Sequence, residues 1–361
     1  MESRGEKIIS LNVGEPDLPP PSEITQAVKS ALDDGMYRYS LVPGIDILRE
    51  KLKDFYQDSF PVELNSSNFV VSNGAKQSIY NIFQSLINSG DEIIIPAPYW
   101  VTFPESVRLA GGNPIIVPTV DNQIDIELIK KAITKNTKAI LINAPNNPSG
   151  AVFPKTALVE LASIALENEL YIISDEAYDG IYFDGKAPVS IGTLSPEIFK
   201  KTITIKSFSK TYSMTGFRVG YTICDSAFSQ LMVKLQGHLT GNNCTFAQFG
   251  ALKALELDQS FYQERRAIYQ KRRDLAFSLS QKIFPNCVKP DGAFFLFPNI
   301  KELLNNSDCK SDIDLSIKIL EKAGVAILPG SAFGQPDHLR ISFAASEKEI
   351  EDGFRAIERV L

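Results

Sequence analysis

The chain has no long apolar segment. None of its apolar runs approaches the ~20 residues that a membrane-spanning helix needs, although 44% of its 361 residues are hydrophobic. The stretch Met1–Lys7 lacks the apolar core of a signal peptide. The sequence therefore predicts a protein without a membrane partner, and we expect it in the cytoplasm.

Histidine and cysteine are scarce. There are two histidines, His238 and His338, and four cysteines whose spacing matches no metal or redox motif. A zinc site or a Ser-His-Asp triad is therefore not expected, and we predict no metal site. The cysteines are expected to be reduced thiols, as is usual in the cytoplasm.

A block of basic residues is also missing. The net charge is −6, and both signs are mixed along the chain. Nucleic-acid-binding domains carry clustered Lys and Arg that meet the phosphate backbone. Nucleic acid is therefore not an expected partner.

What the chain does contain is an alternation of short apolar strands and helices. Strands are predicted at 69–71, 92–95, 114–117, 139–142, 171–173 and 202–205. Helical patterns lie between most of them, which favours an α/β fold with a mostly parallel sheet covered on both faces. Beyond about residue 260 a charged helix at 264–282, a strand at 292–297 and a helix at 347–360 predict a smaller α+β domain.

One lysine lies in a serine-rich loop, Ser207–Gly220, between two predicted strands. A lysine amine attacks a carbonyl only when neutral, so Lys210 would need cationic neighbours or a dry pocket. The guanidinium of Arg218 suits a phosphate. The loop therefore suggests a phosphorylated aldehyde held by Lys210 as a Schiff base. The alternative is an ordinary surface lysine in a polar loop.

Three further features follow predicted strands. Small residues in Gly74-Ala75-Lys76 would let backbone N–H groups meet a phosphate, although they could equally be a plain helix start. Trp100, the only tryptophan, could stack on an aromatic ring or lie in the core. Asn147 presents an amide in a proline-rich turn that could also be a mere loop.

Two charged residues complete the set of candidates. Asp175 ends an apolar strand, where a carboxylate is costly unless paired. It could hold a pyridine nitrogen protonated, with Tyr178 nearby, or it could cap a helix. Arg340 lies in an alternating strand and could clamp a substrate carboxylate or face solvent.

Together these motifs resemble the class I pyridoxal-phosphate-dependent aminotransferases. The resemblance rests on Ser207–Gly220, the Asn-Asn-Pro-Ser-Gly turn at 146–150, Asp-Glu-Ala-Tyr at 175–178 and Pro-Tyr-Trp at 98–100. The nearest branch is that of the aspartate/prephenate aminotransferases. The resemblance implies an α/β fold of type I, with a mostly parallel seven-stranded sheet sandwiched by helices. It also implies a large cofactor-binding domain at 23–262 and a small domain formed by 1–22 and 263–361.

The resemblance assigns roles to individual residues. Lys210 would carry pyridoxal 5'-phosphate and move the substrate proton, Asp175 would pair with the pyridine nitrogen, and Tyr178 would contact the ring. The remaining cofactor contacts would come from Gly74, Ala75, Lys76, Trp100, Asn147, Ser207, Ser209 and Arg218. The substrate would be bound by Arg340, with Gly14, Trp100 and Asn147 close by. Tyr39 would reach the partner's site in a homodimer.

The implied activity is ping-pong transamination, with aspartate and 2-oxoglutarate as the expected substrates. The residue that reads a distal carboxylate stays open among Gln84, Arg108 and Lys76. Three alternatives also stay open: a preference for aromatic amino acids or alanine, a carbon–sulfur β-lyase of the same fold, and a cofactor-sensing regulator. A regulator usually carries a DNA-binding module ahead of the fold, and thirteen residues precede Gly14.

Overall fold

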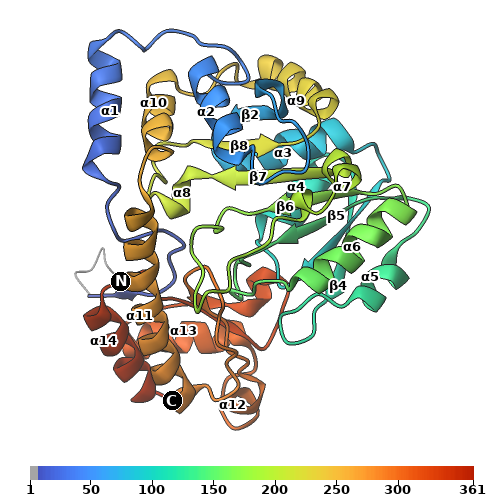
Figure 1. Ribbon diagram of the computed structural model, residues 1–361. Helices are drawn as coiled ribbons and strands as arrows, with labels where there is room; N and C mark the ends of the chain where they lie inside the picture. The colour runs from blue at the N-terminus through green and yellow to red at the C-terminus, as the bar shows by residue number, and fades with distance from the viewer. Residues whose placement is uncertain (1–6) are drawn as a thin grey trace.

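The computed structural model describes residues 7–361 (Figure 1). Its centre is a seven-stranded sheet with the order β2-β8-β7-β6-β5-β3-β4. The strands are β2 (Phe69–Ser72), β3 (Glu92–Ala97), β4 (Asn113–Pro118), β5 (Thr137–Asn143), β6 (Tyr171–Asp175), β7 (Thr202–Ser207) and β8 (Gly220–Ile223). In this sheet β8 is antiparallel to both of its neighbours, β2 and β7, and all other neighbouring strands are parallel. The predicted mostly parallel α/β sheet is confirmed.

Helices cover both faces of this sheet. One face packs against α3 (Ala75–Leu86), α4 (Thr102–Leu109) and α9 (Ser226–Leu239). The other face packs against α5 (Ile126–Ala132), α6 (Lys155–Glu167) and α7 (Pro196–Lys201). In β3, Ile93 and Ile95 join the first core and Ile94 the second, because successive side chains of a strand point to opposite faces. This is why the central strands are apolar throughout.

The edge of the sheet at β2 and β8 carries a third core. It is built by α1 (Ser22–Asp33), α2 (Asp46–Tyr56) and α10 (Thr245–Ala254). The one-turn helix α8 (Phe208–Thr211) also contributes to it. Figure 1 shows α1, α2 and α10 together at this end of the molecule.

The last hundred residues build a separate core beside the sheet. Its helices are α11 (Gln259–Ile283), α12 (Lys301–Asn305), α13 (Asp312–Ala323) and α14 (Glu347–Glu358). Its strands are β9 (Phe295–Leu296), β10 (Val325–Ala326), β11 (Leu328–Pro329) and β12 (Leu339–Ser342). The first strand, β1 (Ile9–Ser10), pairs with β10, and Leu11 enters the same core. The domain division at residues 22 and 263 stays a prediction, and its first six residues lie outside the described part of the chain.

Three local expectations were wrong in detail. The loop after β7 contains α8, since the Oγ of Ser207 accepts the N–H of Ser209 and starts a helical turn. The helix between the strands predicted at 92–95 and 114–117, interpreted as opening at Pro-Tyr-Trp (98–100), begins only at Thr102. Of the strand expected over 292–297, only Phe295 and Leu296 form a strand, β9, because only these two residues pair with β12. Within residues 7–361, no helix combines the length and apolar character needed to cross a membrane.

Candidate active site

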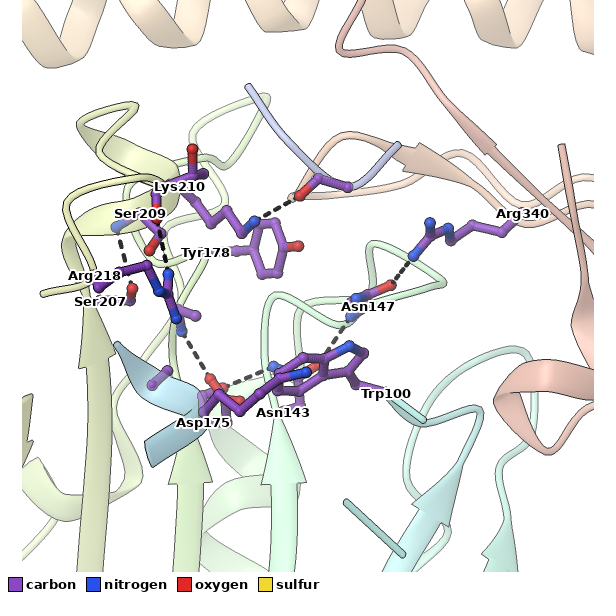
Figure 2. A pocket seen from close by; sticks show the side chains of 15 residues that line it. Trp100, Asn143, Asn147, Asp175, Tyr178, Ser207, Ser209, Lys210, Arg218 and Arg340 are labelled. Carbon is purple, nitrogen blue, oxygen red and sulfur yellow. Dashed lines mark hydrogen bonds between the residues drawn. The ribbon is translucent and has the colours of Figure 1, made fainter. Parts of the chain in front are cut away.

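A cavity of about 350 Å³ opens at the carboxyl ends of the parallel strands. All predicted site residues line it except Gly74, which lies directly behind its wall, and Tyr39. Figure 2 shows Lys210 and Tyr178 between two groups, with Ser207, Ser209 and Arg218 on one side and Asn147 and Arg340 on the other. In open α/β sheets, ligands bind at this edge. Among residues 7–361, no cluster of three or more His, Cys, Asp or Glu side chains could hold a metal ion.

The ends of β5 and β6 fix two of these side chains. Asn143 and Asp175 are paired in the sheet register. The Asn143 Nδ2 donates to the Asp175 carbonyl oxygen at 2.9 Å, and its Oδ1 accepts the N–H of Asn147 at 2.9 Å. Asn143 therefore ties the Asn147 turn to the end of β6.

Asp175 is a buried carboxylate. It is 2% exposed, and its Oδ1 accepts the N–H of Ala177 at 3.1 Å. Burial raises the pKa of Asp175 to about 7, because the charged form loses its hydration; the Ala177 N–H opposes this only in part. A cationic group bound beside the Asp175 carboxylate would therefore be stabilised, because it would compensate the lost hydration of the charge.

Lys210 lies in the single turn of α8, above Tyr178. Its Nζ donates to the Gly14 carbonyl oxygen at 2.6 Å and lies 5.9 Å from the centroid of the Tyr178 ring. The pKa of Lys210 is lowered to about 8, mainly by burial and also by the nearby Arg218, whereas Glu15 opposes the shift. A much larger share of this amine than of an ordinary lysine is therefore neutral at physiological pH, and the neutral form is the nucleophile.

The side of the cavity beneath Lys210 is built for an anion. The Arg218 guanidinium donates to the Thr215 carbonyl at 2.8 Å and to the Asn73 carbonyl at 3.2 Å. Helix α3 starts beside it with Gly74 at φ 76°, where an added Cβ would lie 2.6 Å from Arg218 Nη2. Glycine alone adopts this φ without strain, and Ala75 and Lys76, the first residues of α3, line the same cavity.

The opposite side of the cavity is formed by Arg340 on β12. Its guanidinium lies between the rings of Phe295 and Phe333, at 4.5 and 4.8 Å from their centroids. It donates to Asn147 Oδ1 at 3.0 Å and to the Asn12 carbonyl at 2.6 Å, while its buried Nε has no acceptor. Burial lowers the pKa of Arg340 to about 10. A carboxylate entering the cavity would meet a desolvated, oriented cation.

The remaining predicted residues lie apart from these two sides. The Lys76 Nζ is 4.9 Å from the centroid of the Trp100 ring, and both side chains line the cavity. Of the other candidates for a distal carboxylate, Arg108 pairs with Glu105, and Gln84 donates to the Leu109 carbonyl at 3.2 Å. Neither lines the cavity.

Sequence reasoning missed several lining residues: Asn143, Ala177 and Thr215. It also missed Glu15, which accepts a hydrogen bond from the Thr215 hydroxyl. Ala177 and Thr215 lie inside segments that the motifs had singled out, whereas Asn143 ends the strand before the 146–150 turn and Glu15 follows Gly14. Their position directly at a strand end, or beside a named residue, was the available signal.

The comparisons with known proteins agree with one another. The family described as "Aminotransferase class I and II" matches residues 6–357. A probable aspartate/prephenate aminotransferase of Aquifex aeolicus is 40% identical over 100% of this chain and 93% of its own. The aspartate aminotransferase of Bacillus subtilis is 36% identical over 99% of this chain and 92% of its own.

Solved structures give the same result. The aspartate aminotransferase of Thermus thermophilus with maleate superimposes with a TM-score of 0.94 at 33% identity, covering 100% of this chain and 93% of that one. The aromatic aminotransferase of Pyrococcus horikoshii superimposes with a TM-score of 0.93 at 35% identity, covering 98% and 95%. The predicted fold type and family resemblance are confirmed.

Proposed function

Since the chain belongs to the class I and II aminotransferase family and is a pyridoxal-phosphate-dependent transaminase, we propose that it moves an amino group from aspartate to 2-oxoglutarate. The observation that supports this choice is the cavity itself, which brings Lys210, Asp175 and two arginines together. The relatives named for aspartate or aspartate/prephenate favour aspartate as the amino donor.

The residues present fit the cofactor. The buried Asp175 lacks a cationic partner that a protonated pyridine nitrogen would supply. Arg218, the hydroxyls of Ser207 and Ser209 and the N–H groups at the start of α3 would hold the phosphate. Trp100 would stack on the ring, and Asn147 and Tyr178 would bind its hydroxyl group. When bound, pyridoxal phosphate supplies an aldehyde that takes the substrate nitrogen and a ring that accepts electrons from the α-carbon.

The chain's own residues would then perform three tasks. Arg340 binds the α-carboxylate of the amino acid and orients it, because its guanidinium is held between Phe295 and Phe333. The amine of Lys210 would take the proton from the α-carbon and pass it to the cofactor carbon that held the aldehyde, as its lowered pKa allows, so that the amino group stays on the cofactor and a keto acid leaves. Asp175 keeps the ring nitrogen protonated. One cavity serves both half-reactions, which gives a ping-pong cycle.

A panel of amino donors tests the choice of substrate. Purified protein loaded with pyridoxal phosphate would be mixed with aspartate, alanine, phenylalanine or cystathionine, and the cofactor absorbance and the keto acids would be measured. We expect the highest kcat/KM with aspartate. Faster turnover of phenylalanine or alanine would overturn the aspartate assignment, and pyruvate release from cystathionine would instead indicate a β-lyase.

We further propose that Lys76 reads the distal carboxylate of a dicarboxylic substrate. Replacing Lys76 by alanine should lower kcat/KM for aspartate and 2-oxoglutarate by about 10–100-fold, the effect of losing a hydrogen bond to a charged group. Values for alanine and phenylalanine should change little, since these lack the second carboxylate. Arg108→Ala is the matched control, because Arg108 is a cation outside the cavity. An equal loss for all donors would contradict this role.

The pH dependence of cofactor loading tests the state of Lys210. Only the neutral amine bonds to the aldehyde, and the pKa of Lys210 is about 8. We therefore expect the rate at which the cofactor-free protein takes up pyridoxal phosphate to rise with pH and to reach half its maximum near pH 8. Stopped-flow absorbance would measure it. A midpoint near 10, the ordinary range of a lysine, would show that the amine is not desolvated.

We also propose that the protein is a cytoplasmic homodimer. Tyr39 is 98% exposed, and Tyr37 and Leu41 beside it are exposed as well, so this apolar segment suits a second copy of the chain. In such a dimer Tyr39 would reach the partner's phosphate site. The four unpaired cysteines fit a reducing compartment. Sedimentation and cell fractionation would test the two proposals.

A further inference from the structure

Three fully buried amide side chains lie behind the phosphate side of the cavity, none of which lines it. They are Gln236 near the end of α9, Asn243 in the α9–α10 turn and Gln248 in α10, each 0% exposed. Figure 1 shows α9 and α10 on either side of α2 and β2 at this end of the molecule. Buried amides are costly unless their hydrogen bonds are made, so their partners indicate what they hold in place.

Asn243 bonds both segments that form the phosphate side. Its Nδ2 lies 2.8 Å from the Ser72 carbonyl, 2.9 Å from Asn73 Oδ1 and 2.9 Å from the Arg218 carbonyl. Ser72 and Asn73 lead directly into Gly74 and the start of α3. The Asn73 carbonyl also accepts from the Arg218 guanidinium. One amide therefore links the residues that precede the helix start to the backbone of the arginine.

The same group of amides holds the segment at residues 38–45, in which Arg38, Tyr39 and Leu41 are exposed. Gln248 donates to the Asn243 carbonyl at 3.1 Å and accepts the N–H of Ile45 at 2.8 Å. Gln236 donates to the carbonyls of Val42 and Val71, at 2.8 and 2.9 Å.

The hydroxyl of Thr245, two residues after Asn243, donates to the Arg38 carbonyl at 2.8 Å. The segment that carries Tyr39 is thus fixed to the phosphate side by hydrogen bonds from the end of α9, the α9–α10 turn and the start of α10.

We propose that Asn243, together with Gln236 and Gln248, is a positioning residue that couples cofactor binding to homodimer formation. A phosphate that orders Arg218 and the Gly74 turn orders the 38–45 segment through the same amides. The 38–45 segment is also the surface that the second subunit of the homodimer would cover. Coupling of this kind is reciprocal: the factor by which the cofactor tightens the dimer equals the factor by which dimerisation tightens cofactor binding. The inference rests on the proposed dimer and cofactor site.

The experiment compares wild type, Asn243→Ala and the matched control Asn68→Ala. Asn68 is also a buried amide of the same sheet edge, bonding the Cys224 carbonyl at 2.8 Å and the Asn65 N–H at 2.9 Å, but it contacts neither segment. Cofactor-free protein would be titrated with pyridoxal phosphate by absorbance. The dimer dissociation constant would be measured by sedimentation with and without the cofactor, and thermal unfolding would report the stability of each cofactor-free variant.

In wild type we expect the cofactor to tighten the dimer at least about fivefold, the lower range of allosteric coupling. In Asn243→Ala we expect cofactor affinity to fall about tenfold and the coupling factor to fall, so that only the part due to Tyr39 at the partner's phosphate site remains. Asn68→Ala should lose about as much thermal stability as Asn243→Ala, but its cofactor affinity and its coupling factor should equal those of wild type. If Asn243→Ala and Asn68→Ala behave alike, Asn243 has a structural role only and the inference is wrong.

A second variant guards against misfolding of Asn243→Ala. Thr245→Val leaves the three bonds of Asn243 in place and removes only the hydroxyl that holds Arg38 and Ser40. We expect it to reduce the coupling factor while the cofactor affinity of the monomer stays at the wild-type value. An unchanged coupling factor in Thr245→Val would overturn this inference but leave the proposed function standing. A wild type that binds no pyridoxal phosphate would overturn the proposed function along with it.

Discussion

Replacing Lys210 by alanine should lower transamination by at least about 10⁴-fold, because the change removes both a nucleophile and a general base. The amine is the only lysine nitrogen among the cavity-lining residues that lies beside Tyr178 and the Gly14 carbonyl. The Lys76 amine is held over Trp100 instead. We therefore expect no neighbouring lysine to substitute for it. Single-turnover absorbance with aspartate would measure the loss.

Binding and catalysis can be separated in this variant. Asp175, Arg218 and the serine hydroxyls remain, so Lys210→Ala should still bind pyridoxal phosphate, though without a covalent bond. After borohydride treatment and digestion, the cofactor mass should stay on the Lys210 peptide of wild type and be absent from the variant. Lys200→Ala, at an exposed lysine of α7, serves as the control. Turnover in Lys210→Ala within tenfold of wild type would contradict the role of this amine.

The sequence alone predicted the central sheet because its strands are apolar on both faces. The central residues of β3, β5 and β6 are apolar and enter one of two cores in alternation, so hydrophobic runs bounded by turns stand out. Most of the site then followed from topology. Parallel strands end at one edge, which brings Asn147, Asp175 and Ser207 together although they are far apart in sequence.

The helices α9, α10 and α13 were not predicted. In α10 the buried residues include Ala247, Gln248 and Gly250, and small or polar residues of this kind give no apolar stripe that would mark a helix. The amides of α9 and α10 are buried because tertiary partners satisfy them. Those partners, such as the Val42 and Ser72 carbonyls, lie more than 150 residues away.

The surroundings of Arg340 were also beyond the sequence. Its residue type and its strand suggested a carboxylate clamp, but a solvent-facing arginine fits the same pattern. The difference is made by Phe295 and Phe333, which come from two other segments and bury the guanidinium. Similarly, the lowered pKa of Lys210 results mainly from burial, which depends on the whole fold.

Replacing Asp175 by asparagine should have two opposite effects. Transamination should fall about 10³-fold, because an amide cannot keep the ring nitrogen protonated and one oriented charge is lost. The cofactor-free protein, however, should become more stable at pH 8. The carboxylate is buried without a cationic partner, whereas an asparagine could keep the bond from the Ala177 N–H and carries no charge.

The pH dependence fixes the sign of this second effect. The pKa of Asp175 is about 7 in the folded protein and near 3.8 when unfolded. Below pH 3.8 both states bind the proton, so the wild-type aspartate costs nothing. As pH rises from 3.8 to 7, only the unfolded state releases its proton, and stability falls; above 7 the full cost remains. The gain in Asp175→Asn should thus grow with pH and reach on the order of 4 kcal/mol at pH 8.

Urea unfolding of the cofactor-free proteins between pH 4 and 8 would measure this gain. Asp258→Asn is the control, since Asp258 is an exposed carboxylate that caps α11 and hydrogen bonds from Ser260 lower its pKa. Replacing the Asp258 carboxylate by an amide should destabilise the protein slightly at pH 8 and leave turnover unchanged. Equal stability of wild type and Asp175→Asn at pH 8 would mean that another group already neutralises the carboxylate. The site would then have no need of a cationic ring nitrogen, and the assignment of Asp175 would fail.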